Sequence, residues 1–446
     1  MSKRLLIVVV GLCAGLNLVS CSGNSPQRNR SGLPHRVLAS QSVNTPPSAF
    51  GQLVIVNGDN DTLPRVSSLN GGQTPRMIVL SPTRSIAATF DGSTNSVFAV
   101  DTTTETTIGT GNGIRLPGPT SSMVIPTAGA TGFAAVPSAT VNGFVFQGAV
   151  EALNFSSNSF TTIAVPNAQT VVSNSQGTEL LVFAPDSDNV TVLFPTAAVP
   201  PVDTSCLSAP TGAACTVVQD LSFSRPVNAI INGTTAYILN CGAECGGTVS
   251  GAPAPASVSV FDLGTLTVTQ TIQVDAATVA FLNGSTLYVA GTPKTPPFPC
   301  PASQNTAATN CGVLDVIDLT SAQVATSAAI TDGYHDRMDL TTNGQLFIGS
   351  YNCTNIGNVN NPTGGEIRGC LSIYKLADGS VVIPPDNGDV NGLQGFTTRN
   401  VEYVAEGGQL RVYDTTKDVL LINDFVPQGT IDIVGYVGDV KAIDFF

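Results

Sequence analysis

The chain has no tryptophan, only two histidines, and charged side chains at just 11% of its 446 residues. Lys and Arg number 18 against 31 Asp and Glu, which gives a formal charge of −13. This balance excludes an electrostatic surface for nucleic acid, so we expect no nucleic-acid partner. The chain also lacks Gly-Lys-Ser/Thr, Gly-x-Ser-x-Gly and His-Glu-x-x-His motifs. We therefore expect a non-catalytic role rather than an enzymatic one, and no cofactor.

What the sequence does contain is a nine-residue pattern that returns about every 52 residues. Each copy alternates apolar and other residues, which predicts a strand with two distinct faces. Most copies end in Asp, Asn or Lys followed by small polar residues, which suits a turn. The copies begin at Val97, Val150, Val190, Val258, Leu314, Leu371 and Leu410.

Four short strands can be assigned to each repeat, and no helical pattern interrupts them. A period of this size predicts an all-β fold, a β-propeller of four-stranded blades. Extra strands are expected at both ends, at 51–59 and 65–69 and at 430–437 and 439–446. They favour eight blades over seven, with the last blade closed by both termini.

The segment from Met77 to Gly111 resembles the YVTN-type β-propeller repeats of bacterial and archaeal surface proteins. It reads MIVLSPTRSIAATFDGSTNSVFAVDTTTETTIGTG, and the later stretches TLYVAGTP and VLDVIDLTS are similar. The resemblance covers nearly all of the chain after Phe50 and extends to uncharacterised lipoproteins of this type. It implies the propeller fold and no particular activity.

The N-terminus has the features of an export signal. Lys3 and Arg4 precede a mostly apolar run that ends in Leu-Val-Ser-Cys at Cys21. This ending resembles the bacterial lipobox, which implies cleavage before Cys21 and lipidation of its thiol. We expect a signal peptide at 1–20, a flexible tether at 21–48 and a single propeller domain at 49–446. The predicted location is the bacterial cell envelope, lipid-anchored, with the outer membrane favoured.

Eight further cysteines fall into close neighbours beside Pro-, Gly- or Asn-rich insertions. An exported chain meets an oxidising environment, so disulfides are expected. Local pairing is favoured because each pair brackets one insertion, although spacing alone does not fix it. A zinc site is the alternative, but the His partners are missing. The predicted pairs are Cys206 with Cys215, Cys241 with Cys245, Cys300 with Cys311 and Cys353 with Cys370.

The densest group of chemically capable residues runs from Asp332 to Asp339 and includes His335 and Asp336. The repeat layout places it where one blade leads into the innermost strand of the next, at the rim of the central channel. A histidine beside carboxylates can act as a general base or a metal ligand, and nearby carboxylates raise its pKa. The alternative is a hydrogen-bonded turn with an Arg–Asp pair that seals the channel.

A second group, from Asp386 to Gly392, contains Asp389 and Asn391. Its alternating oxygen-bearing side chains resemble the start of a calcium loop. The expected bidentate Glu is replaced by Thr398, so a plain turn is favoured and no metal is predicted.

Together these features predict a lipid-anchored envelope propeller that acts as a binding or scaffolding module. Its partners would be the membrane, through the lipid, and an envelope protein or glycan. The alternative is an envelope hydrolase or lyase, lactonase-like, that uses a rim site around His335 with Asp336 and Asp339. Convergence of these side chains in an open channel mouth would favour the enzyme.

Overall fold

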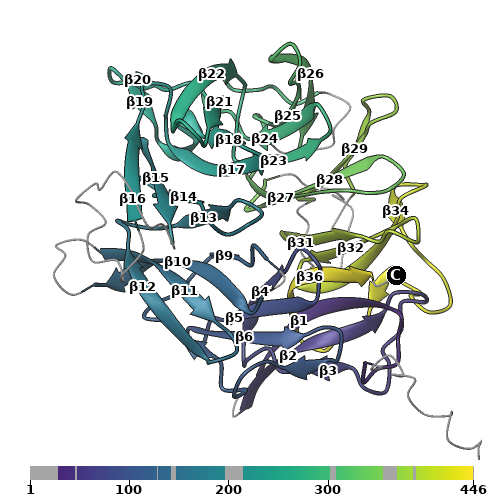
Figure 1. Cartoon of the computed structure of the whole chain (residues 1–446). Helices are drawn as coiled ribbons and strands as arrows, with labels where there is room; N and C mark the ends of the chain where they lie inside the picture. The colour runs from purple at the N-terminus through teal and green to yellow at the C-terminus, as the bar shows by residue number, and fades with distance from the viewer. Residues whose placement is uncertain are drawn as a thin grey trace, which may run out of the picture.

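The computed structural model describes residues 29–45, 48–127, 129–141, 147–195, 214–301, 308–354, 369–384 and 388–444. Within them the chain forms eight blades of four antiparallel strands around a central axis (Figure 1). The predicted eight-bladed propeller is confirmed. Among the described residues, no helix has the length and apolar character needed to cross a membrane. The predicted signal peptide and Cys21 lie outside these ranges.

Blades 1 to 4 follow one another along the chain, each starting with its innermost strand. Blade 1 has β4 (Pro75–Leu80), β5 (Ile86–Asp91), β6 (Ser96–Asp101) and β7 (Thr106–Thr107), and β8 (Ile114–Arg115) also pairs with β6. Blade 2 has β9 (Ser122–Val124), β10 (Thr131–Thr140), β11 (Gln147–Asn154) and β12 (Ser159–Ala164). Blade 3 has β13 (Thr170–Ser173), β14 (Leu180–Phe183), β15 (Asn189–Phe194) and β16 (Ala214–Gln219). Blade 4 has β17 (Pro226–Asn232), β18 (Thr235–Asn240), β21 (Ser257–Asp262) and β22 (Thr267–Gln273).

Blades 5 to 7 repeat this order. Blade 5 has β23 (Val279–Asn283), β24 (Thr286–Gly291), β25 (Gly312–Asp318) and β26 (Gln323–Ile330). Blade 6 has β27 (Tyr334–Leu340), β28 (Gln345–Tyr351), β29 (Leu371–Lys375) and β30 (Val381–Val382). Blade 7 has β31 (Val390–Gly395), β32 (Val401–Glu406), β33 (Gln409–Asp414) and β34 (Val419–Leu420), with β35 (Thr430–Ile431) pairing to β33.

The seven copies of the repeated pattern form the third strand of blades 1 to 7. Their alternation has a structural cause, because each blade is packed on both faces by its neighbours. On β6, Val97 and Ala99 contribute to one core cluster together with Phe155, which follows β11 of blade 2. Val100 contributes to another, together with Leu53 of blade 8. The core is therefore a ring of inter-blade layers rather than a single centre.

Blade 8 closes the ring with strands from both ends of the chain, as predicted. Its innermost strand is β36 (Tyr436–Asp444), followed outwards by β1 (His35–Thr45), β2 (Ser48–Asn57) and β3 (Ser68–Leu69). In Figure 1 the purple N-terminal strands lie beside the yellow β36. The expectation of two strands from each end is wrong, because three come from the N-terminus and one from the C-terminus.

The domain therefore begins earlier than predicted. Strand β1 pairs with β2 from Arg36 to Thr45 and with β36 from His35 to Ser42. The tether predicted over 21–48, and the domain start at 49, are wrong at this boundary. His35 belongs to the folded body rather than to a linker, and its Nδ1 lies 2.7 Å from the Asp59 carboxylate.

Polar contacts fasten blade 8 to both of its neighbours. On the side of blade 1, the Arg36 guanidinium donates to the Glu105 carboxylate at 2.6 Å, with both side chains buried. On the side of blade 7, Asp61 accepts from the Tyr403 hydroxyl at 2.6 Å and pairs with Arg399 at 2.8 Å. The closing blade is thus joined to the ring by ionic contacts as well as by apolar packing.

Neighbouring strands are antiparallel, so two kinds of connection share one edge of the ring. They are the links between strands two and three of a blade and the links that lead into each innermost strand. Three consecutive blades carry long insertions at this edge: residues 241–256, 292–311 and 352–370. We call them the stapled loops and this edge the stapled face. Strand β1 is the second strand of its blade, so His35 lies at the opposite edge.

Each stapled loop is closed by a disulfide, and three predicted pairs are confirmed. The disulfides are Cys241–Cys245, Cys300–Cys311 and Cys353–Cys370. Cys215 is also disulfide-bonded, while its predicted partner Cys206 lies outside the described residues. The local pairing has a simple cause, because both cysteines of each disulfide belong to the same insertion.

Candidate functional site

A cavity of about 480 Å³ opens at the centre of the ring, and we call it the channel cavity. Its charged lining comes from β27 and β36. Arg337 Nη1 lies 3.0 Å from Asp336 Oδ2, and Lys441 Nζ lies 3.6 Å from Asp439 Oδ1. Arg337 Nε also donates to the carbonyl of Asn391 at 2.8 Å. Each cation in this wall thus has an anionic neighbour, and the wall carries no net charge.

A second cavity, of about 430 Å³, lies among the stapled loops, and we call it the stapled cavity. All three loops contribute to its lining, through Glu244, through Thr292 and Lys294, and through Asn352. The junction between blades 5 and 6 adds Asp332 and Tyr334. Tyr334 lines the channel cavity as well, so the two cavities are neighbours on one face.

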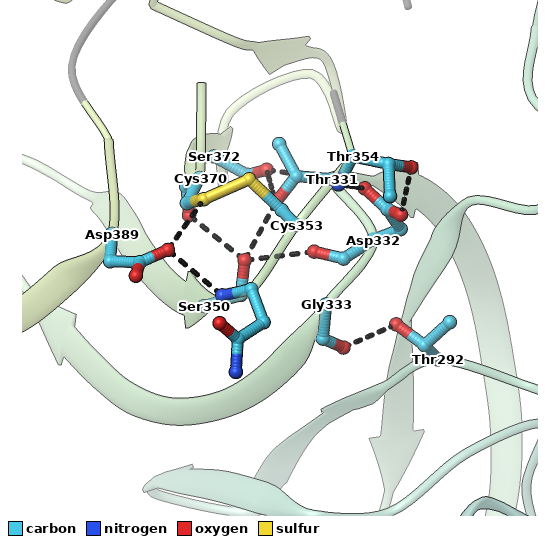
Figure 2. The surroundings of a disulfide bond; sticks show 11 residues. Thr292, Thr331, Asp332, Gly333, Ser350, Cys353, Thr354, Cys370, Ser372 and Asp389 are labelled. Carbon is cyan, nitrogen blue, oxygen red and sulfur yellow. Dashed lines mark hydrogen bonds between the residues drawn. A yellow bond between two sulfur atoms is a disulfide. The ribbon is translucent and has the colours of Figure 1, made fainter. Parts of the chain in front are cut away.

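Hydrogen bonds connect the stapled loops to the strand junction beneath them, as Figure 2 shows around the Cys353–Cys370 disulfide. Thr354 donates to both oxygens of Asp332, from its backbone N–H at 2.9 Å and from its hydroxyl at 2.5 Å. The Thr292 hydroxyl donates to the carbonyl of Gly333 at 2.7 Å. The cavity walls are therefore held in place before any ligand arrives.

In the stapled cavity, burial strongly affects the ionisation of the Glu244 carboxyl. It sits in the short 3₁₀ helix Gly242–Cys245, inside the smallest disulfide ring, and is half-buried. Burial raises the pKa of its carboxyl to about 8, although the Thr292 N–H and the charge of Lys294 act against the rise. Thr292 donates to its Oε2 at 2.9 Å. The group is thus largely protonated near neutral pH.

His335 lies at the start of innermost strand β27, as the repeat layout predicted, but its ring is fully buried. Neither ring nitrogen makes a hydrogen bond of normal geometry within the described part of the chain. Burial lowers the pKa of His335 to about 4, with the Thr331 backbone acting in the opposite direction. The expected rise in pKa from nearby carboxylates is therefore wrong, because desolvation outweighs them.

The three residues proposed for catalysis do not converge. Asp336 is at the channel cavity and is paired with Arg337, whereas His335 is enclosed within the blade. Asp339 accepts from the Gly395 N–H at 2.5 Å. A paired carboxylate and an enclosed imidazole match the sealed arrangement rather than an open acid–base site. The geometry therefore gives the enzyme hypothesis no support.

Replacing His335 with Ala is expected to lower the free energy of unfolding by about 2–3 kcal/mol at pH 7, because it leaves a cavity in a packed blade. The difference from wild type should shrink as the pH falls from about 6.5 towards 4. In that pH range the His335 ring is protonated in the unfolded wild-type chain but stays neutral in the folded one, so wild-type stability falls. Urea titrations at pH 7 and pH 5 test both statements; an unchanged difference would contradict the second.

The residues that resemble the start of a calcium loop make hydrogen bonds to other parts of the protein. Asp389 Oδ1 accepts from the Asn352 N–H at 2.8 Å, and the Asn391 amide donates to the Tyr436 hydroxyl at 2.9 Å. Asp386 lies outside the described residues. Within those residues, no cluster of three or more His, Cys, Asp or Glu has the arrangement of a metal site. Asp389 instead connects the third stapled loop to blade 7.

The stapled cavity was not predicted from the sequence. Glu244 stands between Cys241 and Cys245, whose spacing indicates only a disulfide, and Lys294 and Thr292 carry no motif. One signal was available, since three consecutive repeats carry Cys-bracketed insertions at the same strand connection. Equivalent connections in a propeller share one edge, so these insertions had to gather on one face.

No protein-family model and no curated protein matches the chain. Among solved structures, the Dos1 propeller is similar over 83% of this chain and 86% of its own, with 9% identity and a TM-score of 0.55. The dihydro-heme d1 dehydrogenase NirN is similar over 95% of this chain and 78% of its own, with 11% identity and a TM-score of 0.53. BamB from Moraxella catarrhalis is similar over 85% and 92%, with 11% identity and a TM-score of 0.46. The first two likenesses show that the chain shares the β-propeller fold.

Proposed function

We propose that this protein is an envelope propeller, held to a membrane by lipid on Cys21, that binds a partner protein or glycan with its stapled face. The observation that carries the proposal is the clustering of three disulfide-closed loops around one cavity on one edge of the ring. A regular repeat needs no such insertions for its fold, and rigid loops on a scaffold are where binding sites concentrate.

The disulfides also support an oxidising compartment, because such bonds are rare in proteins of the cytosol. The lipobox-like ending at Cys21 and the resemblance to YVTN-type surface repeats support the envelope and the anchor. A lipid at Cys21 would leave the stapled face on the far side of the ring from the membrane, since β1 starts at the opposite edge. That orientation leaves the face open to a partner.

The anchor is tested by membrane fractionation of the Cys21→Ala chain. Wild type should be found with membranes, and the variant should be released or left unprocessed. Cys13→Ala is the matched control, because that residue belongs to the predicted signal peptide and should change nothing. Normal processing and unchanged membrane association of Cys21→Ala would contradict the lipid anchor.

The binding face is tested by placing a photo-cross-linking residue at Thr309, which lines the stapled cavity, or at Asp378, which is exposed in the β29–β30 connection at the opposite edge. A defined product, protein or glycan, is expected from Thr309 in intact envelopes and not from Asp378. Equal labelling from both positions, or none from Thr309, would overturn the proposed face.

A further inference from the structure

We propose that the stapled cavity binds a cationic amine, with Glu244 and Asp332 as the anionic groups that receive it. This rests on the proposed binding role of the stapled face and adds the chemistry of the ligand. Two independent features lead to it: the charge of the cavity and the state of its hydrogen bonds.

Once Glu244 is ionised, above its raised pKa, the charge of the lining is unbalanced. Two carboxyl groups, Glu244 and Asp332, face one ammonium, that of Lys294, which is exposed at the mouth. In the described part of the chain, neither carboxyl takes part in an ion pair. The contrast with the channel cavity is clear, because there each carboxylate lies against Arg337 or Lys441. A ligand cation would supply the missing positive charge.

The hydrogen bonds to the two carboxyls fix their positions and leave them able to accept further hydrogen bonds from such a ligand. Glu244 accepts the Thr292 N–H, and Asp332 accepts two donors from Thr354. All three donors come from the protein side and fix the oxygens in position. A carboxylate oxygen has more than one lone pair, so acceptor capacity remains. An ammonium or guanidinium group, which donates several hydrogen bonds and accepts none, is the matching partner.

The position of Glu244 leaves little room for rearrangement. A Cβ on Gly291 would lie 2.6 Å from Glu244 Oε2, so the bare glycine backbone of β24 makes space for the carboxyl. The Cys241–Cys245 disulfide holds the backbone on the other side. Tyr334, whose own pKa is raised by burial and by the charges of Tyr351 and Glu244, completes the wall. The group is thus fixed in the cavity by covalent and steric limits.

Two sources present this chemistry: a free small amine, or a lysine side chain on a protein partner. Calorimetry on the purified full chain separates them with 1,4-diaminobutane and with Nα-acetyl-lysine methylamide as probes. The Nε-acetylated form of the second probe is neutral and serves as its control. We expect at least one amine to bind at pH 8.5 and the neutral form not to bind. The tighter of the two amines identifies the source.

Glu244→Gln should weaken amine binding by about tenfold or more, the loss of one charge-assisted contact. Glu179→Gln removes the same charge at a site outside both cavities and should leave the affinity unchanged within about twofold. Near-ultraviolet circular dichroism checks that Glu244→Gln remains folded. Equal binding of the neutral probe, or unchanged affinity in Glu244→Gln, would overturn the inference.

The pH dependence gives a second readout. An amine binds the ionised carboxyl, so affinity should rise between pH 6 and pH 8.5, by up to about tenfold per pH unit below the pKa of Glu244. Lys294, Asp332 and Tyr334 are the other titratable groups of the lining, and the variant isolates Glu244 from them. In Glu244→Gln the rise should disappear. Cross-linking from Thr309 without amine binding would overturn this inference and leave the proposed binding face intact.

Discussion

Replacing Glu105 with Ala is expected to lower the free energy of unfolding by about 3–5 kcal/mol, because the change leaves a buried guanidinium without its counter-ion. Arg36 and Glu105 are each 1% exposed. Besides Arg36, the Glu105 carboxylate accepts the N–H of Ser31 at 2.5 Å and its hydroxyl at 2.6 Å. One side chain thus fastens the N-terminal segment and β1 to blade 1, and its loss should loosen the closed ring.

Three variants make the test specific, each followed by urea denaturation. Arg36→Met with Glu105→Leu removes both charges and should cost much less than Glu105→Ala alone. Lys417→Ala breaks the exposed Lys417–Asp414 pair, at 3.2 Å, and should cost less than about 0.5 kcal/mol. If Glu105→Ala is as stable as Lys417→Ala, the contact between Arg36 and Glu105 does not secure ring closure.

The second large effect concerns Glu402, which is fully buried in β32 with no hydrogen bond to either carboxyl oxygen among the described residues. A Cβ on Gly395 would lie 2.9 Å from Glu402 Oε2 and 3.2 Å from Asp339 Oδ2, so the two carboxyls crowd the same glycine. Burial and the charge of Asp339 raise the pKa of Glu402 well above its ordinary value, while Lys441 opposes the rise. The native state therefore holds a proton that the unfolded chain releases.

Glu402→Gln should thus become more stable than wild type as the pH rises. Above the unfolded pKa the native state binds more protons than the unfolded state, so wild-type stability falls with pH. Gln is neutral at every pH, and its amide can donate to Asp339. The gap between variant and wild type should widen between pH 5 and pH 8, by at most about 1.4 kcal/mol per pH unit.

Asp378→Asn is the matched control, since it removes one negative charge from an exposed turn. The pKa of Asp378 is lowered by hydrogen bonds from Ser380, so the effect of this variant should not change between pH 5 and pH 8. Parallel urea titrations of the three proteins measure the slopes. A Glu402→Gln slope equal to that of wild type would mean that Glu402 is ionised in the folded protein.

The repeated strands were predictable because both faces of a blade are buried and the alternation is therefore kept in every copy. Strand β1 was missed for the opposite reason. Its buried Arg36 and Gln41 are satisfied by distant partners, Glu105 and the carbonyl of Val434, and a sequence read locally shows only a polar segment. The disulfide pairs were predictable because both cysteines of each pair lie within one insertion. The stapled cavity was not predictable in this way, because it joins loops about 50 residues apart in sequence.

The position of β1 also determines how the molecule carries load. A pull on the chain ahead of His35 acts along β1, which is paired on one side with β2 and on the other with β36. Both ladders run parallel to that force, so their hydrogen bonds are strained together in shear rather than opened one by one. Arg36 lies next to the residue where the force is applied, and its hydrogen bond to Glu105 fixes it to blade 1. The strand that closes the ring is thereby also a point of attachment that resists load in shear.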